Sequence, residues 1–159
     1  MSDTADRLAR LEAVAAITAL KHRYFRACDA KDPKGFRECF STAGAELDYG
    51  ELGALDADGM AAVFASIALS QVDGAHAILD MHHGVHPDIT VRDDGTAGGR
   101  WTLRFRQLNL IERTETVATG EYTDEYVVED GRWKIAKCTF VRLWALTRPL
   151  GPDCRVVQG

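Results

Sequence analysis

The hydrophobic pattern of this chain changes from a helical period to a strand period between its first and second halves. In the first third, apolar residues recur at spacings of three and four, which predicts one amphipathic helix over residues 4–30. Either Asp3 or Thr4 can cap its start. Such a helix must bury its apolar side against another element. That side comprises Leu8, Leu11, Val14, Ile17, Leu20, Tyr24, Phe25 and Cys28.

A second, shorter helix is predicted directly after the first. Asp32 is typical of a helix cap, and Pro33 suits the first helical position, where its missing N–H has no partner to lose. This helix should run through Phe40. A short strand is expected over residues 45–49.

A third helix is predicted before the middle of the chain. Its start is expected at Asp56 or Asp58, and its apolar residues continue through Ile67. Gly74 is placed to stop it, because glycine readily adopts the left-handed conformation that ends helices.

The second half alternates between apolar and polar residues, which is typical of half-buried antiparallel strands. The alternation is clear over residues 89–91, 101–105 and 122–128. Asp94-Gly95 and Asp130-Gly131 lie between such runs, and Asp-Gly supplies the positive φ angles of tight hairpins. Four long strands joined by hairpins are therefore expected.

Helices followed by a meander of strands predict an α+β fold. We expect a cone-shaped barrel in which a curved, mostly antiparallel sheet has the N-terminal helices packed over its concave face. A small ligand would bind in the pocket between them. No repeat or linker divides the 159 residues, so residues 1–159 should form a single domain.

The charge pattern argues against nucleic-acid and membrane partners. The net charge is −5, and Lys and Arg do not gather into the basic stripe that phosphate binding requires. The apolar runs are far shorter than the ~20 residues of a bilayer crossing. The N-terminus is acidic where a secretory signal would be basic. A cytoplasmic location is expected.

The four cysteines do not form a recognisable framework. Cys28, Cys39, Cys138 and Cys154 include no CxxC pair, so we expect buried free thiols rather than disulfides or a zinc site.

Asp29 and a group of histidines are the first candidates for chemistry. Asp29 lies at the edge of the apolar side of the first helix, where a carboxylate needs a partner unless it turns back to solvent. His82, His83 and His86 crowd at the start of a predicted strand. On a strand, His82 and His86 would be about 13 Å apart, too far to share one ion, so no metal site is expected. A catalytic base is the stronger functional interpretation.

Polar side chains on apolar faces form a second group. Tyr24 lies on the buried side of the first helix, and Tyr49 ends the short strand. Alternation places Tyr122 and Asp124 on the same face as Tyr126. Single buried tyrosines are common in cores, but together these residues would give an apolar pocket a few converging polar groups.

Several of these segments together resemble a known family. They are residues 24–32, the strand 47–50, His82-x3-His86-Pro87-Asp88-Ile89, and residues 120–126 leading into 130–135. The chain resembles the SnoaL-like branch of the nuclear transport factor 2-like superfamily over residues 5–147, which leaves 148–159 as a C-terminal tail that breaks regular structure.

The resemblance implies a cone-shaped α+β fold that often uses no cofactor. Its eliminating members pair a helix aspartate with a strand histidine, and Asp29 and His82 fall on those positions. Tyr24 and Tyr49 fall where the dehydratases bind or polarise the substrate oxygen. One eliminating member of the family, a dehydrochlorinase, has a lysine at the Tyr24 position and an arginine at the Cys138 position. This chain has neither of those two residues, which weakens a dehalogenation role.

Which histidine faces the pocket is open at this stage. Strict alternation back from Ile89 selects His83, whereas the family spacing selects His82. A bulge near Gly84 would reverse the facing and reconcile the two, and we favour His82.

The leading functional hypothesis is a cofactor-independent lyase or isomerase acting on a small apolar molecule with a carbonyl or hydroxyl. Asp29 would orient His82, His82 would remove a carbon-bound proton, and Tyr24 and Tyr49 would bind the oxygen where charge develops. Further contacts with the substrate are expected from His83, His86, Tyr122, Asp124, Cys138, Phe64, Trp101 and Phe140.

Two alternatives share this fold class. One is a non-catalytic ligand-binding or scaffold domain, which would have no need for a desolvated Asp29 beside a histidine. The other is a polyketide-cyclase-like aldol enzyme with similar acid–base groups. In every case we expect a small-molecule ligand, and association of the chain into a dimer or trimer.

Overall fold

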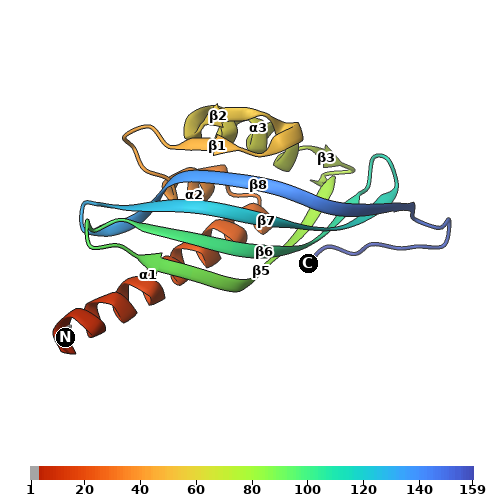
Figure 1. The fold of residues 1–159 in the computed structure, drawn as a ribbon. Coiled ribbons are helices and arrows are strands. Elements are labelled where there is room, and N and C mark those ends of the chain that lie inside the picture. Colours follow the sequence, from red (N-terminus) through yellow and green to blue (C-terminus); the bar gives the residue numbers. More distant parts are fainter. Residues whose placement is uncertain (1–3) are drawn as a thin grey trace.

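The computed structural model describes residues 4–159 and has helices in its first half and long strands in its second (Figure 1). Asp3, one of the two expected helix caps, lies outside these residues. The elements follow in the order α1 (Thr4–Asp29), α2 (Pro33–Glu38), β1 (Glu46–Asp48), the short 3-10 helix η1 (Gly50–Leu52), β2 (Ala54–Asp56), α3 (Ala57–Ala68), β3 (Gln71–Val72), β4 (Ala75–His76), β5 (Ile78–Val91), β6 (Ala97–Asn109), β7 (Thr114–Glu129) and β8 (Arg132–Pro149).

Helix α1 has the predicted length, but only its C-terminal half is buried. Its buried residues begin at Ile17. Leu8 is 55% exposed and Leu11 is 68% exposed, so the prediction that they are buried was wrong. The reason is visible in Figure 1, where the first turns of α1 extend past the edge of the sheet.

The shorter helices begin at aspartate caps. The Asp32 carboxylate accepts a hydrogen bond from the Gly35 amide, and Pro33 opens α2, as predicted. Asp56 caps α3. The helix ends at Ala68, so Gly74 does not stop it. Gly74, at a φ of 78°, instead lies between the two short strands β3 and β4.

The main sheet is open, curved and mostly antiparallel, as predicted for the fold class. Its strand order is β2-β1-β8-β7-β6-β5, and β1 runs parallel to β8. Asp130 and Gly131 both have positive φ in the hairpin between β7 and β8, which confirms the predicted turn. The core lies where α1, α2 and α3 pack against the β6, β7 and β8 side chains.

A bulge in β5 decides which histidine faces the helices. Pairing with β6 shifts between Val85 and Asp88, and His86 in this segment has a φ of 52°. The extra residue reverses the facing, so His82 shares the inner face with Ile89 although their spacing is odd. The predicted bulge and the choice of His82 over His83 are confirmed.

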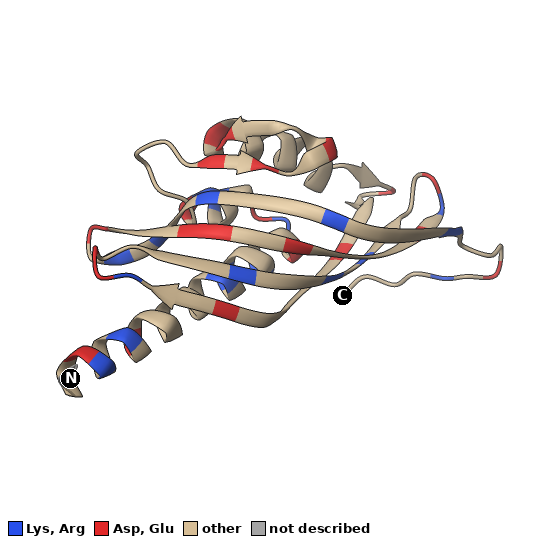
Figure 2. Ribbon diagram, in the orientation of Figure 1, with Lys and Arg blue, Asp and Glu red and all other residues tan. Residues whose placement is uncertain are grey.

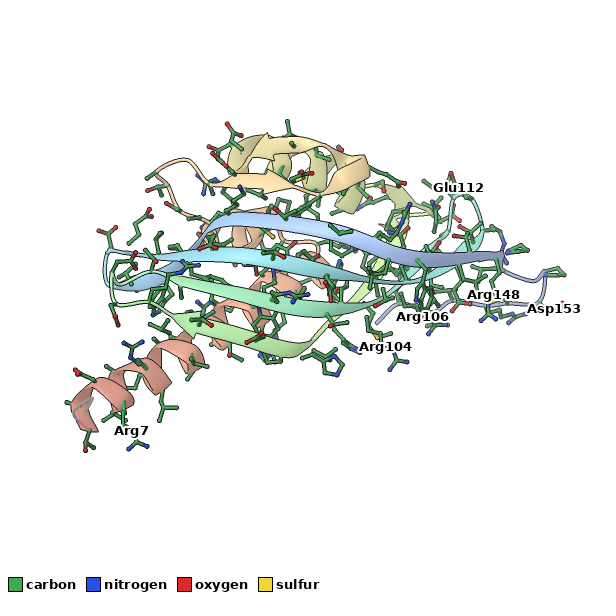
Figure 3. The ribbon with its side chains drawn as sticks, in the orientation of Figure 1. Arg7, Arg104, Arg106, Glu112, Arg148 and Asp153 are labelled. Atoms are coloured by element: carbon green, nitrogen blue, oxygen red, sulfur yellow. The ribbon has the colours of Figure 1, made fainter. Side chains whose placement is uncertain are left out.

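Strand β8 continues further than expected. Arg148 and Pro149 pair with β7, so the predicted break at residue 148 was wrong. The Glu115 carboxylate binds Arg148 and Arg106, which lie near one another in Figure 3. The second half of β8 exposes several large apolar residues, and self-association stays a prediction. These residues are Val141, Leu143, Trp144 and Leu146.

Acidic and basic residues are interspersed over the long strands (Figure 2). No helix within residues 4–159 is long and apolar enough to span a bilayer.

Cys28, Cys39 and Cys138 are buried free thiols, as predicted. Cys154 is exposed because it lies beyond β8 in the tail, so the prediction that it is buried was wrong.

Candidate active site

The last turn of α1 and the inner face of β5 bring Asp29 and His82 into contact. One carboxylate oxygen, Oδ1 of Asp29, lies 2.6 Å from Nδ1 of the His82 ring. The His82 backbone N–H also donates to Oδ1 and Oδ2 of the same carboxylate, at 3.0 and 3.2 Å. Because a carboxylate can only accept, Nδ1 carries a proton, and in the neutral ring the lone pair is then on Nε2.

The environment of His82 is largely apolar. Its side chain is 14% exposed, whereas that of Asp29 is 32% exposed. The imidazole stacks on Phe25 at 6.2 Å and tilts against Phe105 at 4.8 Å between ring centroids. Gly84 makes room for Phe25, because a Cβ there would lie 2.1 Å from the ring. Nε2 forms no hydrogen bond with the residues that the structure describes, so it is available to a ligand.

Beside His82 lies a cavity of about 860 Å³. Its volume falls in the range of small-molecule sites. The wall is mainly apolar, with contributions from α1, α3 and every long strand. The predicted site residues that line it are Tyr24, Tyr49, Phe64, His82, Tyr122 and Phe140.

Three tyrosines cluster in this wall. The hydroxyls of Tyr24 and Tyr49 are hydrogen-bonded at 2.9 Å. The Tyr122 ring meets both rings edge-on, with centroids 6.0 and 6.3 Å away. Burial raises the pKa of all three phenols well above the usual value, and nearby cysteine side chains raise it further. The three hydroxyls therefore remain protonated donors at neutral pH.

A buried lysine that the sequence analysis missed lies beneath the tyrosines. Lys21 is fully buried, and its Nζ lies 2.7 Å from Oδ2 of Asp124 and 3.9 Å from the centre of the Tyr122 ring. The missed signal was its position four residues from both Ile17 and Phe25, on the buried side of α1.

This ion pair explains why two predicted contact residues do not line the cavity. Asp124 is fully buried, and its Oδ2 also accepts a hydrogen bond from the Tyr126 hydroxyl at 2.7 Å. That hydroxyl in turn accepts from Nε1 of Trp101 at 3.0 Å. Asp124 and Trp101 are therefore part of a buried polar network in the core rather than a surface for substrate.

Three other predicted contacts also lie elsewhere. Cys138 is fully buried beside Lys21, with Sγ 3.9 Å from Nζ, and burial raises the pKa of its thiol. His83 and His86 are exposed, because His83 has the opposite facing to His82 and His86 lies in the bulge. Within residues 4–159 there is no group of three or more His, Cys, Asp or Glu side chains placed to share a metal ion.

Asp80 is a polar cavity residue that the sequence analysis also missed. It lies on the inner face of β5, two residues before His82, which is the signal that could have identified it. Its carboxylate is ion-paired with Lys31 and accepts a hydrogen bond from Nε2 of Gln107 at 2.9 Å. Asp80 and Gln107 thus provide polar groups in a wall that is mainly apolar.

Solved structures with a similar fold include proteins whose names refer to elimination reactions. A type 2 hexachlorocyclohexane dehydrochlorinase, LinA, is 19% identical with a TM-score of 0.76, covering 96% of this chain and 99% of that one. A structure described as a putative scytalone dehydratase from Novosphingobium aromaticivorans DSM 12444 is 20% identical with a TM-score of 0.75, covering 93% and 97%. LinA-type3 from Novosphingobium barchaimii LL02 is 16% identical with a TM-score of 0.76, covering 96% and 99%.

The sequence itself matches a family profile over most of its length. The SnoaL-like domain profile matches residues 9–139, which includes Asp29, His82 and the three tyrosines of the cavity. This confirms the resemblance drawn from the motifs, and the open curved sheet with its helices is the nuclear transport factor 2-like fold. The chain therefore belongs to the SnoaL-like domain family.

Proposed function

We propose that this protein is a cofactor-independent lyase or isomerase that removes a carbon-bound proton from a small, largely apolar substrate. The observation that carries the proposal is the 2.6 Å contact between Asp29 and Nδ1 of His82 at the edge of the cavity. A neutral imidazole with one nitrogen held by a carboxylate and the other free is well suited to act as a general base near neutral pH.

The proposed reaction begins when Nε2 of His82 takes a proton from the carbon next to a carbonyl. The bonding electrons move to the carbonyl oxygen, and the negative charge of Asp29 stabilises the imidazolium that forms. Tyr24 and Tyr49 share a 2.9 Å hydrogen bond, so one hydroxyl would donate to the resulting enolate while the other donates to that hydroxyl. The enolate then expels a leaving group from the β-carbon, or regains the proton at another carbon, which shifts the double bond.

The composition of the cavity supports a substrate class. Phe64, Phe105 and Phe140 line an apolar volume, while Asp80 and Gln107 add polar groups to its wall. We therefore propose a small apolar molecule that carries a carbonyl or hydroxyl. Dehydration and dehydrochlorination, the reactions in the names of two structural neighbours, are both β-eliminations, which supports the proposed type of reaction.

Hydrogen–deuterium exchange tests the proton abstraction without knowledge of the natural substrate. A panel of β-hydroxy and β,γ-unsaturated ketones would be incubated with the protein in D₂O, and NMR would follow deuterium incorporation next to the carbonyl. We expect exchange with the wild type and a loss of about 10²–10⁴-fold in His82→Gln. His83→Gln is the matched control, because its ring lies on the outer face of the same strand, and it should retain the wild-type rate.

Two outcomes would overturn the proposal. One is an undiminished exchange rate in His82→Gln. The other is the absence of exchange in every compound that NMR shows to occupy the cavity, which would favour a ligand-binding domain.

A further inference from the structure

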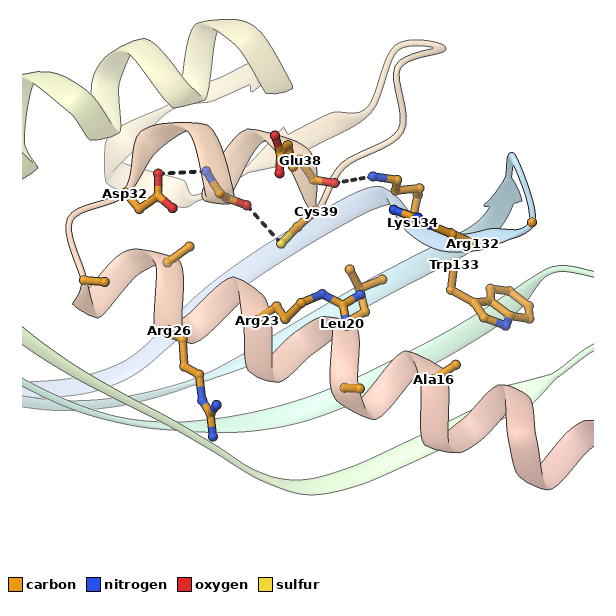
Figure 4. Close-up of a pocket in the computed structure, with 15 residues that line it drawn as sticks. Ala16, Leu20, Arg23, Arg26, Asp32, Glu38, Cys39, Arg132, Trp133 and Lys134 are labelled. Atoms are coloured by element: carbon orange, nitrogen blue, oxygen red, sulfur yellow. Dashed lines mark hydrogen bonds between the residues drawn. The ribbon is translucent and has the colours of Figure 1, made fainter.

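A second concave site lies on the other side of α1 from the proposed active site. It is a groove of about 770 Å³ between α1, α2 and the β7–β8 turn (Figure 4). Tyr24 and Cys28 face the first cavity, whereas Arg23 and Ala27 face the groove, so α1 separates the two. No residue lines both.

Several basic side chains that form no ion pair with residues 4–159 line the groove. Across residues 4–159, 11 of the chain's 19 Lys and Arg side chains form ion pairs with Asp or Glu. Four of the others, Arg23, Arg26, Arg132 and Lys134, line this one groove. Such a concentration of unpaired positive charge is unusual on a chain with a net charge of −5.

The two carboxylates in the groove do not neutralise these cations. Asp32 accepts a hydrogen bond from the Gly35 amide at the start of α2, and Glu38 pairs with Lys34 at 3.8 Å. Lys134 donates to the Glu38 backbone oxygen, which carries no formal charge. In Figure 4, Arg23 extends into the gap above α1, while the guanidinium of Arg26 points away from it.

The Cys39 thiol lies within reach of two groove cations. Burial raises the pKa of Cys39 to about 11 and the charge of Glu38 adds to this, while the charges of Arg23, Lys134 and the buried Lys21 act in the opposite direction. Both groove cations are therefore close enough to favour a negative charge at this position.

The remaining surface of the groove is apolar. The α1 side is formed by alanines, which leave room for a ligand to approach the helix, together with Leu20. Trp133, at the start of β8, is half-buried and provides a flat aromatic surface. The alanines are Ala16, Ala19, Ala27 and Ala30.

We propose that this groove is a second ligand site for a small organic anion, consisting of a carboxylate or phosphate headgroup on a flat apolar body. The guanidinium groups of Arg23 and Arg132 would bind the headgroup, because their planar forks match the geometry of both anions. Trp133 and the alanine surface would contact the apolar body. The volume of the groove suits a molecule of this size.

The test uses three related probes and a matched pair of variants. The probes are 2-naphthoate, 2-naphthyl phosphate and 2-naphthol, which share the ring system but differ in headgroup and charge at pH 7. Amide NMR shifts locate binding, because Gly35 and Gly131 line the groove whereas Gly50 lines the first cavity. The variants are Arg23→Gln/Arg132→Gln and, as control, Arg7→Gln/Arg104→Gln, which removes two arginines outside the groove that form no ion pair with residues 4–159 (Figure 3).

We expect the two anions to shift Gly35 and Gly131, with an affinity that falls as salt is added. The groove variant should weaken their binding by at least about tenfold, because charge-assisted hydrogen bonds are lost. The control variant should stay within about twofold of the wild type. Comparison of the naphthoate and phosphate arms identifies the preferred headgroup.

The proposal fails if neither anion shifts the groove amides at millimolar concentration, or if the shifts are confined to residues around Gly50. It also fails if 2-naphthol binds the groove as tightly as the anions, or if both variants weaken binding equally. Amide spectra of each variant establish that the fold is retained, so that a loss of binding is assigned to the lost charges.

Discussion

The carboxylate of Asp29 binds His82 twice, through Nδ1 of the ring at 2.6 Å and through the backbone amide at 3.0 Å. One side chain at the end of α1 therefore fixes both the imidazole and the strand that carries it. This arrangement sets the tautomer of His82, which lines the cavity, and leaves Nε2 without a hydrogen bond to residues 4–159.

Asp29→Asn should lower the rate of proton exchange by about 10²–10⁴-fold, because an amide neither stabilises the imidazolium nor enforces the tautomer. The measurement is deuterium incorporation, combined with ¹⁵N NMR of the His82 ring to observe the change of tautomer. Asp153→Asn, in the exposed tail, makes the same chemical change elsewhere and should have no effect. An Asp29→Asn variant as active as the wild type would rule out the dyad.

Tyr24→Phe and Tyr49→Phe should each reduce exchange by about 10²-fold, since each removes a hydroxyl proposed to stabilise the enolate. The double variant should lose less than the product of the two single effects, because the hydroxyls share a 2.9 Å hydrogen bond. Steady-state exchange rates of all four proteins give this comparison. If both single variants matched the wild type, the tyrosines would have no catalytic role.

Stability should decline steeply above about pH 10. Burial raises the pKa of Tyr24, Tyr49 and Tyr122 in the folded protein, whereas an unfolded phenol ionises near 10.0. Above that pH the unfolded state binds fewer protons, so the free energy of unfolding falls as pH rises, while it is insensitive to these groups below it.

Urea unfolding between about pH 8 and about pH 11 measures this effect, with phenolate absorbance as a second signal. Tyr122→Phe should flatten the decline, because one buried phenol no longer contributes. Ionisation of all the tyrosines near pH 10 without unfolding would contradict the prediction.

Removing one partner of the buried Lys21–Asp124 pair should destabilise the fold by about 3–5 kcal/mol, because the other charge is left without a partner. Both side chains are fully buried, with 2.7 Å between Nζ and Oδ2. Lys21→Met/Asp124→Leu should be less destabilised than the sum of the two single variants. Urea unfolding gives all three values.

The exposed pair Arg100–Glu121 provides the control for this measurement. Its partners are 2.9 Å apart but their side chains are 61% and 41% exposed. Arg100→Met should cost no more than about 1 kcal/mol. A Lys21→Met variant with the stability of Arg100→Met would show that the buried pair contributes little.

The features predicted correctly from sequence all depend on residues close together along the chain. The apolar spacing of α1, the cap at Asp32 and the turn at Asp130-Gly131 are set by a few neighbouring residues. The bulge in β5 was inferred from the disagreement between local strand alternation, which selects His83, and the family spacing, which selects His82. The family motif added the pairing of Asp29 with His82, which lie 53 positions apart.

The features that sequence analysis missed depend on how distant segments pack. Leu8 and Leu11 have the correct helical spacing but lie beyond the sheet edge, so they stay more than half exposed. Asp124 has the predicted facing, but it forms a buried ion pair with Lys21 from α1 and therefore does not line the cavity.

The amino-acid sequence by itself therefore determined the helices, the long strands and the hairpin turn at Asp130-Gly131, because hydrogen bonding and apolar periodicity act over a few residues. The pairing of Asp29 with His82 came from the family resemblance, since no local pattern links residues 53 positions apart. Only the tertiary structure decided that Tyr24, Tyr49 and His82 share one cavity while Asp124 and Trp101 belong to the core. Burial and ion pairing are properties of side chains brought together from separate elements, and no local pattern contains that information.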